Sequence, residues 1–182
     1  HEMQFSADRH YAIDRYSRMD MPPVYNLVDL KSPQRYFEIV RNTTDTLLAA
    51  GWHAPKLITV KAADGKTDLY GLMYTPSNLD PVKKYPIISN VYPGPQDDQI
   101  PLQFTIDDSG NQSLAELGFI VINVAPRGSS PYRGRDFLAF GYGNLRDYPL
   151  ADNRKVILEL AQRYSYIDTT RVGIYGHSGG GF

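Results

Sequence analysis

Three short, almost purely apolar runs in the second half of the chain constrain its fold more than any other feature. They cover residues 86–91, 119–124 and 171–175. A strand that is apolar on both sides must be covered on both faces, as in a mostly parallel sheet. Residues 111–117 and 150–164 separate these runs and have helical spacing of apolar side chains. This alternation predicts a doubly wound α/β fold.

The first half of the chain has a different pattern, in which short strand-like segments are separated by turn residues. Residues 11–16 and 24–28 read as short strands separated by a Met-Pro-Pro break. Because two strands cannot bury a core alone, we expect them to need neighbours that the chain does not contain. Further on, residues 56–61 and 67–74 flank an Asp-Gly pair at 64–65, which predicts a β-hairpin.

Composition excludes several classes of function. The 182 residues carry 19 Lys and Arg against 20 Asp and Glu, a balance that does not favour a nucleic-acid partner. The absence of Cys excludes disulfides, Cys-ligated zinc and a thiol nucleophile. No apolar run is long enough to predict a transmembrane segment, and the first residues lack a signal-peptide core. We therefore expect the chain to be cut from something longer.

The last apolar run leads directly into a G-x-S-x-G motif made by Gly176, Ser178 and Gly180. In a nucleophile elbow, a sharp turn from strand to helix presents the serine hydroxyl above the sheet. Larger side chains at the two flanking glycines would collide in such a turn. The backbone N–H of Gly179 would then point at a developing oxyanion. We interpret Ser178 as a nucleophile, the alternative being a structural glycine-rich turn.

His177 adjoins the candidate nucleophile but is not expected to act as its base, because an elbow directs this neighbouring side chain elsewhere. In elbows of this kind the chain order is Ser, then Asp or Glu, then His. The other histidines, at positions 1, 10 and 53, all precede the serine. We therefore expect the base and its orienting acid beyond Phe182, and expect the chain alone to be inactive.

Three motifs together resemble the catalytic domain of the prolyl oligopeptidase family, in particular its dipeptidyl peptidase IV branch. They are residues 85–95 (Tyr-Pro-Ile-Ile-Ser-Asn-Val-Tyr-Pro-Gly-Pro), the Arg-Gly-Ser triplet at 127–129, and the elbow at 176–180. The resemblance implies a serine peptidase with an α/β-hydrolase domain, incomplete here at its C-terminus. It implies that residues 1–35 end an N-terminal β-propeller and that residues 36–182 form the first half of the hydrolase domain.

The resemblance also implies roles for individual residues. Ser178 would be the nucleophile, and the hydroxyl of Tyr92 would form the oxyanion hole beside the Gly179 N–H. A phenol suits this role because it is a strong donor on a rigid side chain, although core packing is the alternative for one of 14 tyrosines. Arg127 would support the site structurally, or else form a surface salt bridge.

The elbow departs from the family pattern at one position. Dipeptidyl peptidases usually have Tyr after the nucleophile, where this chain has Gly179. A missing aromatic side chain weakens the expectation of cleavage after proline, so an esterase of the same fold and a non-catalytic binding protein remain alternatives. The resemblance implies peptide substrates and neither a metal nor an organic cofactor. It also favours an exported protein, periplasmic or secreted, and a homodimer.

Overall fold

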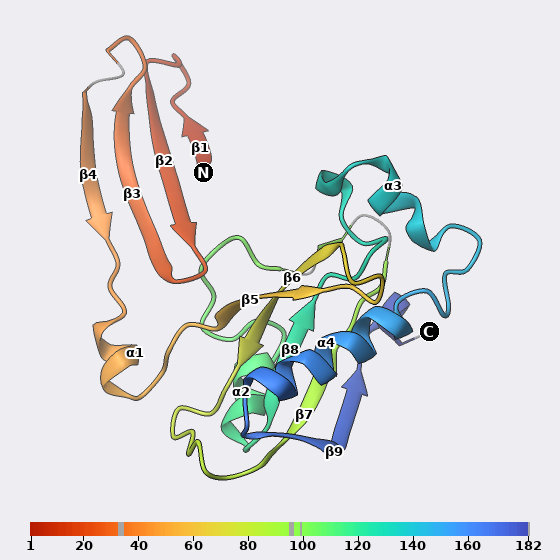
Figure 1. Cartoon of the computed structure of the whole chain (residues 1–182). Helices are drawn as coiled ribbons and strands as arrows, with labels where there is room; N and C mark the ends of the chain where they lie inside the picture. Colours follow the sequence, from red (N-terminus) through yellow and green to blue (C-terminus); the bar gives the residue numbers. More distant parts are fainter. Residues whose placement is uncertain (33–34, 95–96, 99, 182) are drawn as a thin grey trace. The chain divides into compact units, whose positions relative to one another are not determined.

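The computed structural model divides the chain into two compact units, each with its own sheet (Figure 1). The first unit comprises His1–Ala54 and Pro101–Ile106, and the second comprises Pro55–Ile100 and Asp107–Phe182. The described residues are 1–32, 35–94, 97–98 and 100–181. Pro95 and Phe182, which the sequence analysis quotes, lie outside them. No helix in these ranges combines the length and apolar character of a membrane span.

The first unit is built on a four-stranded antiparallel sheet, with strands in chain order (Figure 1). Its strands are β1 (Glu2–Phe5), β2 (Tyr11–Arg18), β3 (Met21–Asp29) and β4 (Tyr36–Arg41), and α1 (Asp45–Ala49) follows. The expectation that β2 and β3 find no neighbours within the chain is wrong, since β1 pairs with β2 and β4 pairs with β3. All six residues of β4 are exposed, so burial gives this strand no alternating pattern.

A distant segment completes the first unit. Trp52 donates its indole N–H to the carbonyl of Ile106 at 2.9 Å. The same ring lies edge-on to Phe104, with centroids 5.7 Å apart. The backbone N–H of Phe104 in turn donates to Ser17 Oγ at 3.2 Å. Residues 101–106 are therefore attached to the first sheet although the chain on either side of them belongs to the second unit.

The second unit holds a five-stranded mixed sheet in the order β5-β6-β8-β7-β9. The predicted hairpin is confirmed as β5 (Lys56–Lys61) and β6 (Asp68–Tyr74), paired antiparallel. The three apolar runs form β7 (Tyr85–Asn90), β8 (Ile120–Val124) and the second half of β9 (Ile167–Tyr175). As predicted, these three strands are parallel, with β7 between β8 and β9.

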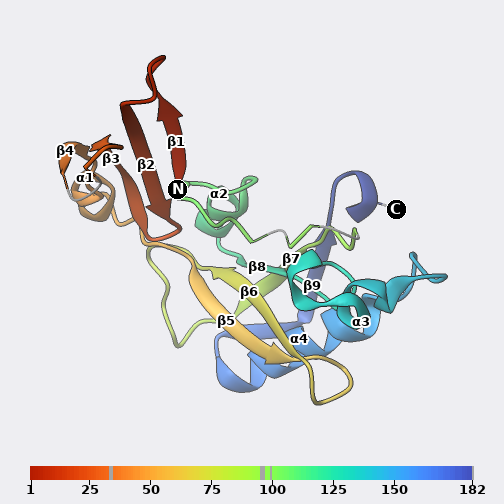
Figure 2. The same cartoon turned by 90° about the horizontal axis from the view of Figure 1, so that it is seen from above.

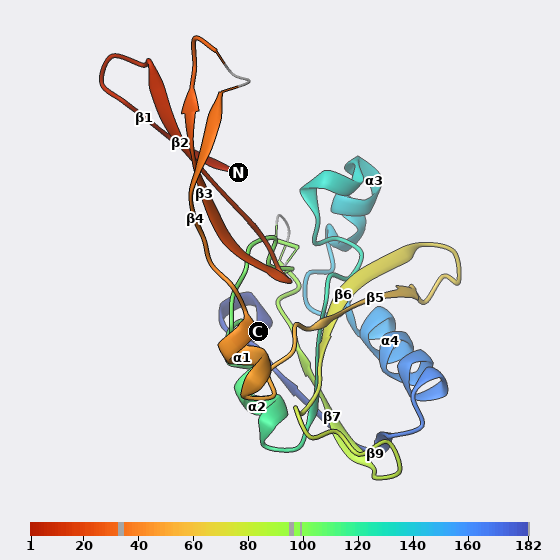
Figure 3. The same cartoon turned by 90° about the vertical axis from the view of Figure 1, so that its left-hand side faces the viewer.

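Both predicted helices of the second unit are confirmed, as α2 (Asn111–Glu116) and α4 (Leu150–Arg163). They cover opposite faces of the sheet, as two perpendicular views show (Figures 2 and 3). Between β8 and α4 lie three short elements that the sequence did not predict: η1 (Pro131–Arg133), α3 (Arg135–Leu138) and η2 (Ala139–Gly141). The core between the sheet and α4 is mainly aliphatic, and its fully buried members include Val60, Leu69, Ile87, Ile122, Val156 and Leu160.

Candidate active site

The site is built where two parallel strands end side by side. The carboxyl ends of parallel strands meet at one edge of a sheet, where α/β proteins commonly bind ligands. β7 ends at Asn90 and β9 ends at Tyr175, and these two residues are paired. The pairing extends one step further, because the N–H of Val91 donates to the carbonyl of Tyr175 at 2.9 Å. Tyr92 and the G-x-S-x-G motif therefore leave the sheet as neighbours.

Ser178 has the strained backbone of a sharp turn. Its φ angle is +53°, a conformation that costs a residue with a side chain roughly 1–3 kcal/mol. A single 3₁₀ turn, η3 (Ser178–Gly180), begins there, and the N–H of Gly180 donates to the carbonyl of His177 at 2.8 Å. The serine is exposed to solvent. Among the residues described, no side chain forms a hydrogen bond with Ser178 Oγ, so the hydroxyl is open to a reacting group.

The two flanking glycines leave space for the neighbouring backbone. A Cβ atom on Gly180 would lie 1.9 Å from the carbonyl oxygen of Val91, and one on Gly176 would lie 2.4 Å from that same oxygen. Both distances are far below van der Waals contact. The absence of side chains at these two positions thus allows the turn to pack directly on the segment that carries Tyr92.

Replacement of Gly180 by alanine is therefore expected to destabilise the turn. The clash with backbone cannot be relieved by a side-chain rotation, so we expect a loss of about 1–3 kcal/mol in the free energy of unfolding. Gly179→Ala is the matched control, since its Cβ would meet only the Tyr92 ring, at an ordinary 3.7 Å. Chemical denaturation of both variants gives the measurement. Equal stability of the two would contradict this account of the glycines.

Tyr92 lies against the turn. A Cβ atom on Gly179 would be 3.8 Å from Tyr92 Cε2 and 4.0 Å from the Tyr92 hydroxyl oxygen. On its other side, the ring is so close to Gly94 that a Cβ there would lie 2.5 Å from Tyr92 Cε1. The structure thus brings the Tyr92 hydroxyl beside Gly179, the residue after Ser178. A phenol and a backbone N–H in this arrangement can both donate to one oxygen atom.

A buried asparagine joins the two strand ends behind the site. Asn111 is fully buried, and its Oδ1 accepts from Asn90 Nδ2 at 2.9 Å and from the Tyr175 hydroxyl at 2.7 Å. Burial, together with the nearby charges of Asp107 and Asp108, raises the pKa of Tyr175 and keeps its hydroxyl a donor. The sequence analysis gave this residue no part in the site, and only the fold brings its partners together.

Arg127 lies in a buried ion pair at the carboxyl end of β8. Its guanidinium donates to both oxygens of Asp152 at 2.9 and 2.8 Å, and to Asp64 at 3.0 Å. The Asp152 side chain is completely buried and that of Arg127 is 13% exposed. The hydrogen bonds that the guanidinium donates to Asp152 raise the pKa of Arg127 above its usual value. Arg127 therefore anchors the loop after β8 to the start of α4.

The structure brings Ser178, Gly179, Gly176, Gly180 and Tyr92 into one cluster. His177 is exposed, and none of the histidines in the described ranges forms a hydrogen bond with Ser178. A complete acid–base system for the serine is therefore not assembled from the described residues.

Comparison with known proteins agrees with this geometry. Residues 105–182 match the model of the prolyl oligopeptidase family. The chain is 31% identical to human dipeptidyl peptidase 8 over 182 residues, which is 94% of this chain and 20% of that protein. The chain is therefore similar to the prolyl oligopeptidase family in its second half and to a dipeptidyl peptidase over almost its whole length. The family resemblance expected from the three motifs is thereby confirmed.

Solved structures related to this family have the same fold. A Bacteroides ovatus protein described as a candidate dipeptidyl aminopeptidase IV matches with a TM-score of 0.79 and 34% identity, over 99% of this chain and 25% of that one. Dipeptidyl peptidase 4 of Porphyromonas gingivalis matches with the same TM-score at 24% identity, over 98% of this chain and 25% of that one. The chain spans about a fifth of the length of the curated relatives it matches.

Proposed function

We propose that the whole protein is a serine peptidase of the dipeptidyl peptidase type, with Ser178 as its nucleophile. The observation that carries the proposal is the strained turn at Ser178, packed against the segment in which Tyr92 lies beside Gly179. A serine with a left-handed backbone directly after a parallel strand is the arrangement that a nucleophile elbow requires. The names of the similar proteins supply the substrate class, peptides with a free N-terminus.

In the proposed reaction, Ser178 Oγ attacks the carbonyl carbon of the substrate peptide bond while a histidine base takes the hydroxyl proton. The carbonyl oxygen becomes an oxyanion, which accepts hydrogen bonds from the Tyr92 hydroxyl and the Gly179 N–H. The C–N bond then breaks, the amine leaves with the proton from the base, and an acyl-enzyme remains on Ser178. Water hydrolyses this ester in the same way.

The proposal also assigns the two units to two domains. We assign the second unit to the first half of an α/β-hydrolase domain, because its strand order brings the serine to the end of β9 beside the β7 end. We assign the sheet β1–β4 to the end of a β-propeller, whose blades are four-stranded antiparallel sheets. The predicted boundary at residue 35 falls between β3 and β4, so this assignment puts the change of domain after β4.

An esterase of the same fold is the second candidate, and Gly179 is the observation that favours it. The residue after the serine carries no side chain and is exposed, so it cannot contribute an aromatic wall to a proline pocket. A more open site would accept esters whose side chain next to the scissile bond varies in size and shape.

Three substrates separate these candidates. The whole protein is expected to release nitroaniline from an X-Pro anilide with a free α-amine, with a higher kcat/KM than from the same anilide acylated on that amine. Hydrolysis of a short-chain nitrophenyl ester without any anilide cleavage would overturn the peptidase proposal in favour of the esterase. Inactivity on all three, in a protein that also resists a fluorophosphonate probe, would favour a non-catalytic role.

A further inference from the structure

Tyr148 holds the segment that carries Tyr92. Its side chain is 7% exposed and its hydroxyl donates to the carbonyl oxygen of Pro93 at 2.6 Å. The ring is fixed by close backbone contacts, because a Cβ on either Gly128 or Gly141 would lie 2.6 Å from it. Burial raises the pKa of Tyr148 to about 12, so the hydroxyl remains protonated near neutral pH.

The carbonyl that Tyr148 binds belongs to a peptide group that is fixed at both ends. The N–H of this group, on Gly94, donates to the carbonyl of Tyr92 at 2.7 Å and closes a tight turn. Its oxygen, on Pro93, accepts from Tyr148. With both polar atoms bound, the peptide plane has one orientation. The Tyr92 ring lies against Gly94, where a Cβ atom would be 2.5 Å from Tyr92 Cε1.

We propose that Tyr148 is a positioning residue, which acts through the Pro93–Gly94 peptide to hold the Tyr92 hydroxyl where the oxyanion forms. The inference rests on the proposed function, because it needs Tyr92 as an oxyanion donor. Donors to an oxyanion stabilise the transition state only when their position is fixed beforehand, since reorganisation during the reaction would offset the gain.

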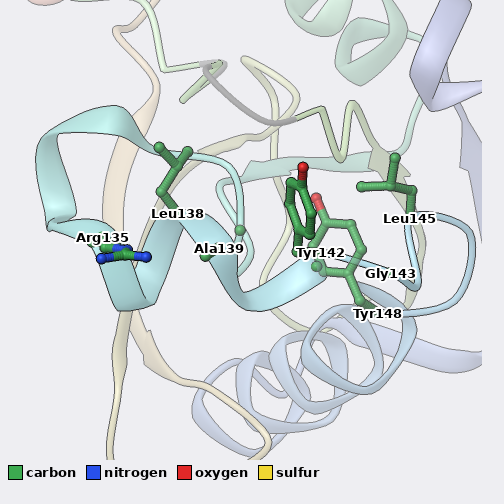
Figure 4. Close-up of a pocket in the computed structure, with 9 residues that line it drawn as sticks. Arg135, Leu138, Ala139, Tyr142, Gly143, Leu145 and Tyr148 are labelled. Carbon is green, nitrogen blue, oxygen red and sulfur yellow. The ribbon is translucent and has the colours of Figure 1, made fainter.

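A cavity beside Tyr148 makes a clean test possible. It has a volume of about 520 Å³, and Figure 4 shows Tyr142 and Tyr148 in its wall between Leu138 and Leu145. Tyr142 is 92% exposed, whereas Tyr148 is buried and hydrogen-bonded. Phenylalanine at 148 keeps the ring contacts with Gly128 and Gly141 and removes only the oxygen atom. Tyr142→Phe removes the same atom from the same cavity without touching Pro93.

Tyr148→Phe in the whole protein is expected to lower kcat for a dipeptide anilide about 10-fold, the order of one hydrogen bond. KM is expected to stay within about twofold, because the change affects transition-state stabilisation and not substrate binding. Tyr142→Phe is expected to leave both constants unchanged. Thermal unfolding of each variant serves as a second measurement, since a merely structural role would lower the melting temperature and leave the kcat of the folded enzyme intact.

A double-mutant cycle with Tyr92→Phe decides whether Tyr148 acts through Tyr92. Tyr92→Phe is expected to lower kcat roughly 10²–10³-fold, as for loss of one oxyanion donor. In that background, Tyr148→Phe should cause no further loss. A wild-type kcat for Tyr148→Phe, or a full 10-fold loss in both backgrounds, overturns the positioning role and leaves the proposed function standing. A wild-type kcat for Tyr92→Phe overturns the oxyanion assignment and the positioning role with it.

Discussion

Replacement of Ser178 by alanine is expected to lower kcat/KM of the whole protein for a peptide substrate by about 10⁶-fold. Removal of the nucleophile from a serine peptidase leaves only substrate binding and oxyanion stabilisation, and costs a factor of that order. The hydroxyl of Ser178 lies at the tip of the strained turn, exposed, and no other serine of the described chain has a positive φ angle except Ser109.

Labelling with a fluorophosphonate probe measures the same property without a choice of substrate. The unaltered protein should be labelled covalently and Ser178→Ala should not be. Ser165→Ala is a matched control, because Ser165 is an exposed serine in the turn between α4 and β9. Labelling that persists in Ser178→Ala would place the nucleophile elsewhere. Thermal unfolding of the variant should match that of the unaltered protein, since the exposed hydroxyl makes no hydrogen bond with a described side chain.

The parallel strands and the main helices could be predicted because each has a strong local signature. β7 and β8 are almost purely apolar runs, and α4 has apolar residues at helical spacing. These patterns follow from burial on one or both sides, which the sequence records directly. The G-x-S-x-G motif could be interpreted as an elbow for the same reason, because it directly follows the apolar run at residues 171–175.

The short elements after β8 could not be predicted in this way. The elements η1, α3 and η2 have three or four residues each, fewer than a hydrophobic period needs to be recognised. The start of β9 is a different case, because the Asp168-Thr169-Thr170 sequence is typical of a turn. The Asp168 carboxylate does accept turn-like hydrogen bonds from the N–H and hydroxyl of Thr170. These residues nonetheless belong to β9, and the register with β7 shifts there. Pro86 pairs with Asp168, whereas Ile87, the next residue of β7, pairs with Val172.

The residues that contact the candidate site's segments from elsewhere in the chain could not be predicted from the sequence either. Arg127 was singled out by its motif, but Asp152 looked like an ordinary acidic residue in the first turn of a helix. Tyr148 is one of 14 tyrosines, and nothing in its neighbourhood along the chain distinguishes it. Both residues act on segments that lie 25 or more positions away. Such contacts depend on the tertiary fold, and a single sequence carries no local signal for them.

Asp152 is the residue whose loss should most destabilise the second unit. Its carboxylate is fully buried and accepts four hydrogen bonds, from the backbone N–H groups of Ala63 and Arg127 and from two atoms of the Arg127 guanidinium. Asp152→Ala would leave the guanidinium in a largely buried site with Asp64 as its remaining carboxylate partner. Breaking a buried pair in this way costs about 3–5 kcal/mol, and we expect that loss in the free energy of unfolding.

Two further variants show whether the charge or the packing is responsible. Asp147→Ala is the control, because it removes an exposed carboxylate paired with Arg146 and should cost at most about 1 kcal/mol. The double variant Asp152→Ala/Arg127→Met should be more stable than the sum of its single changes predicts, since it leaves no unpaired buried charge. Urea denaturation measures all of these. If Asp152→Ala costs no more than Asp147→Ala, or if the two single losses simply add, the ion pair does not anchor the loop after β8 to α4.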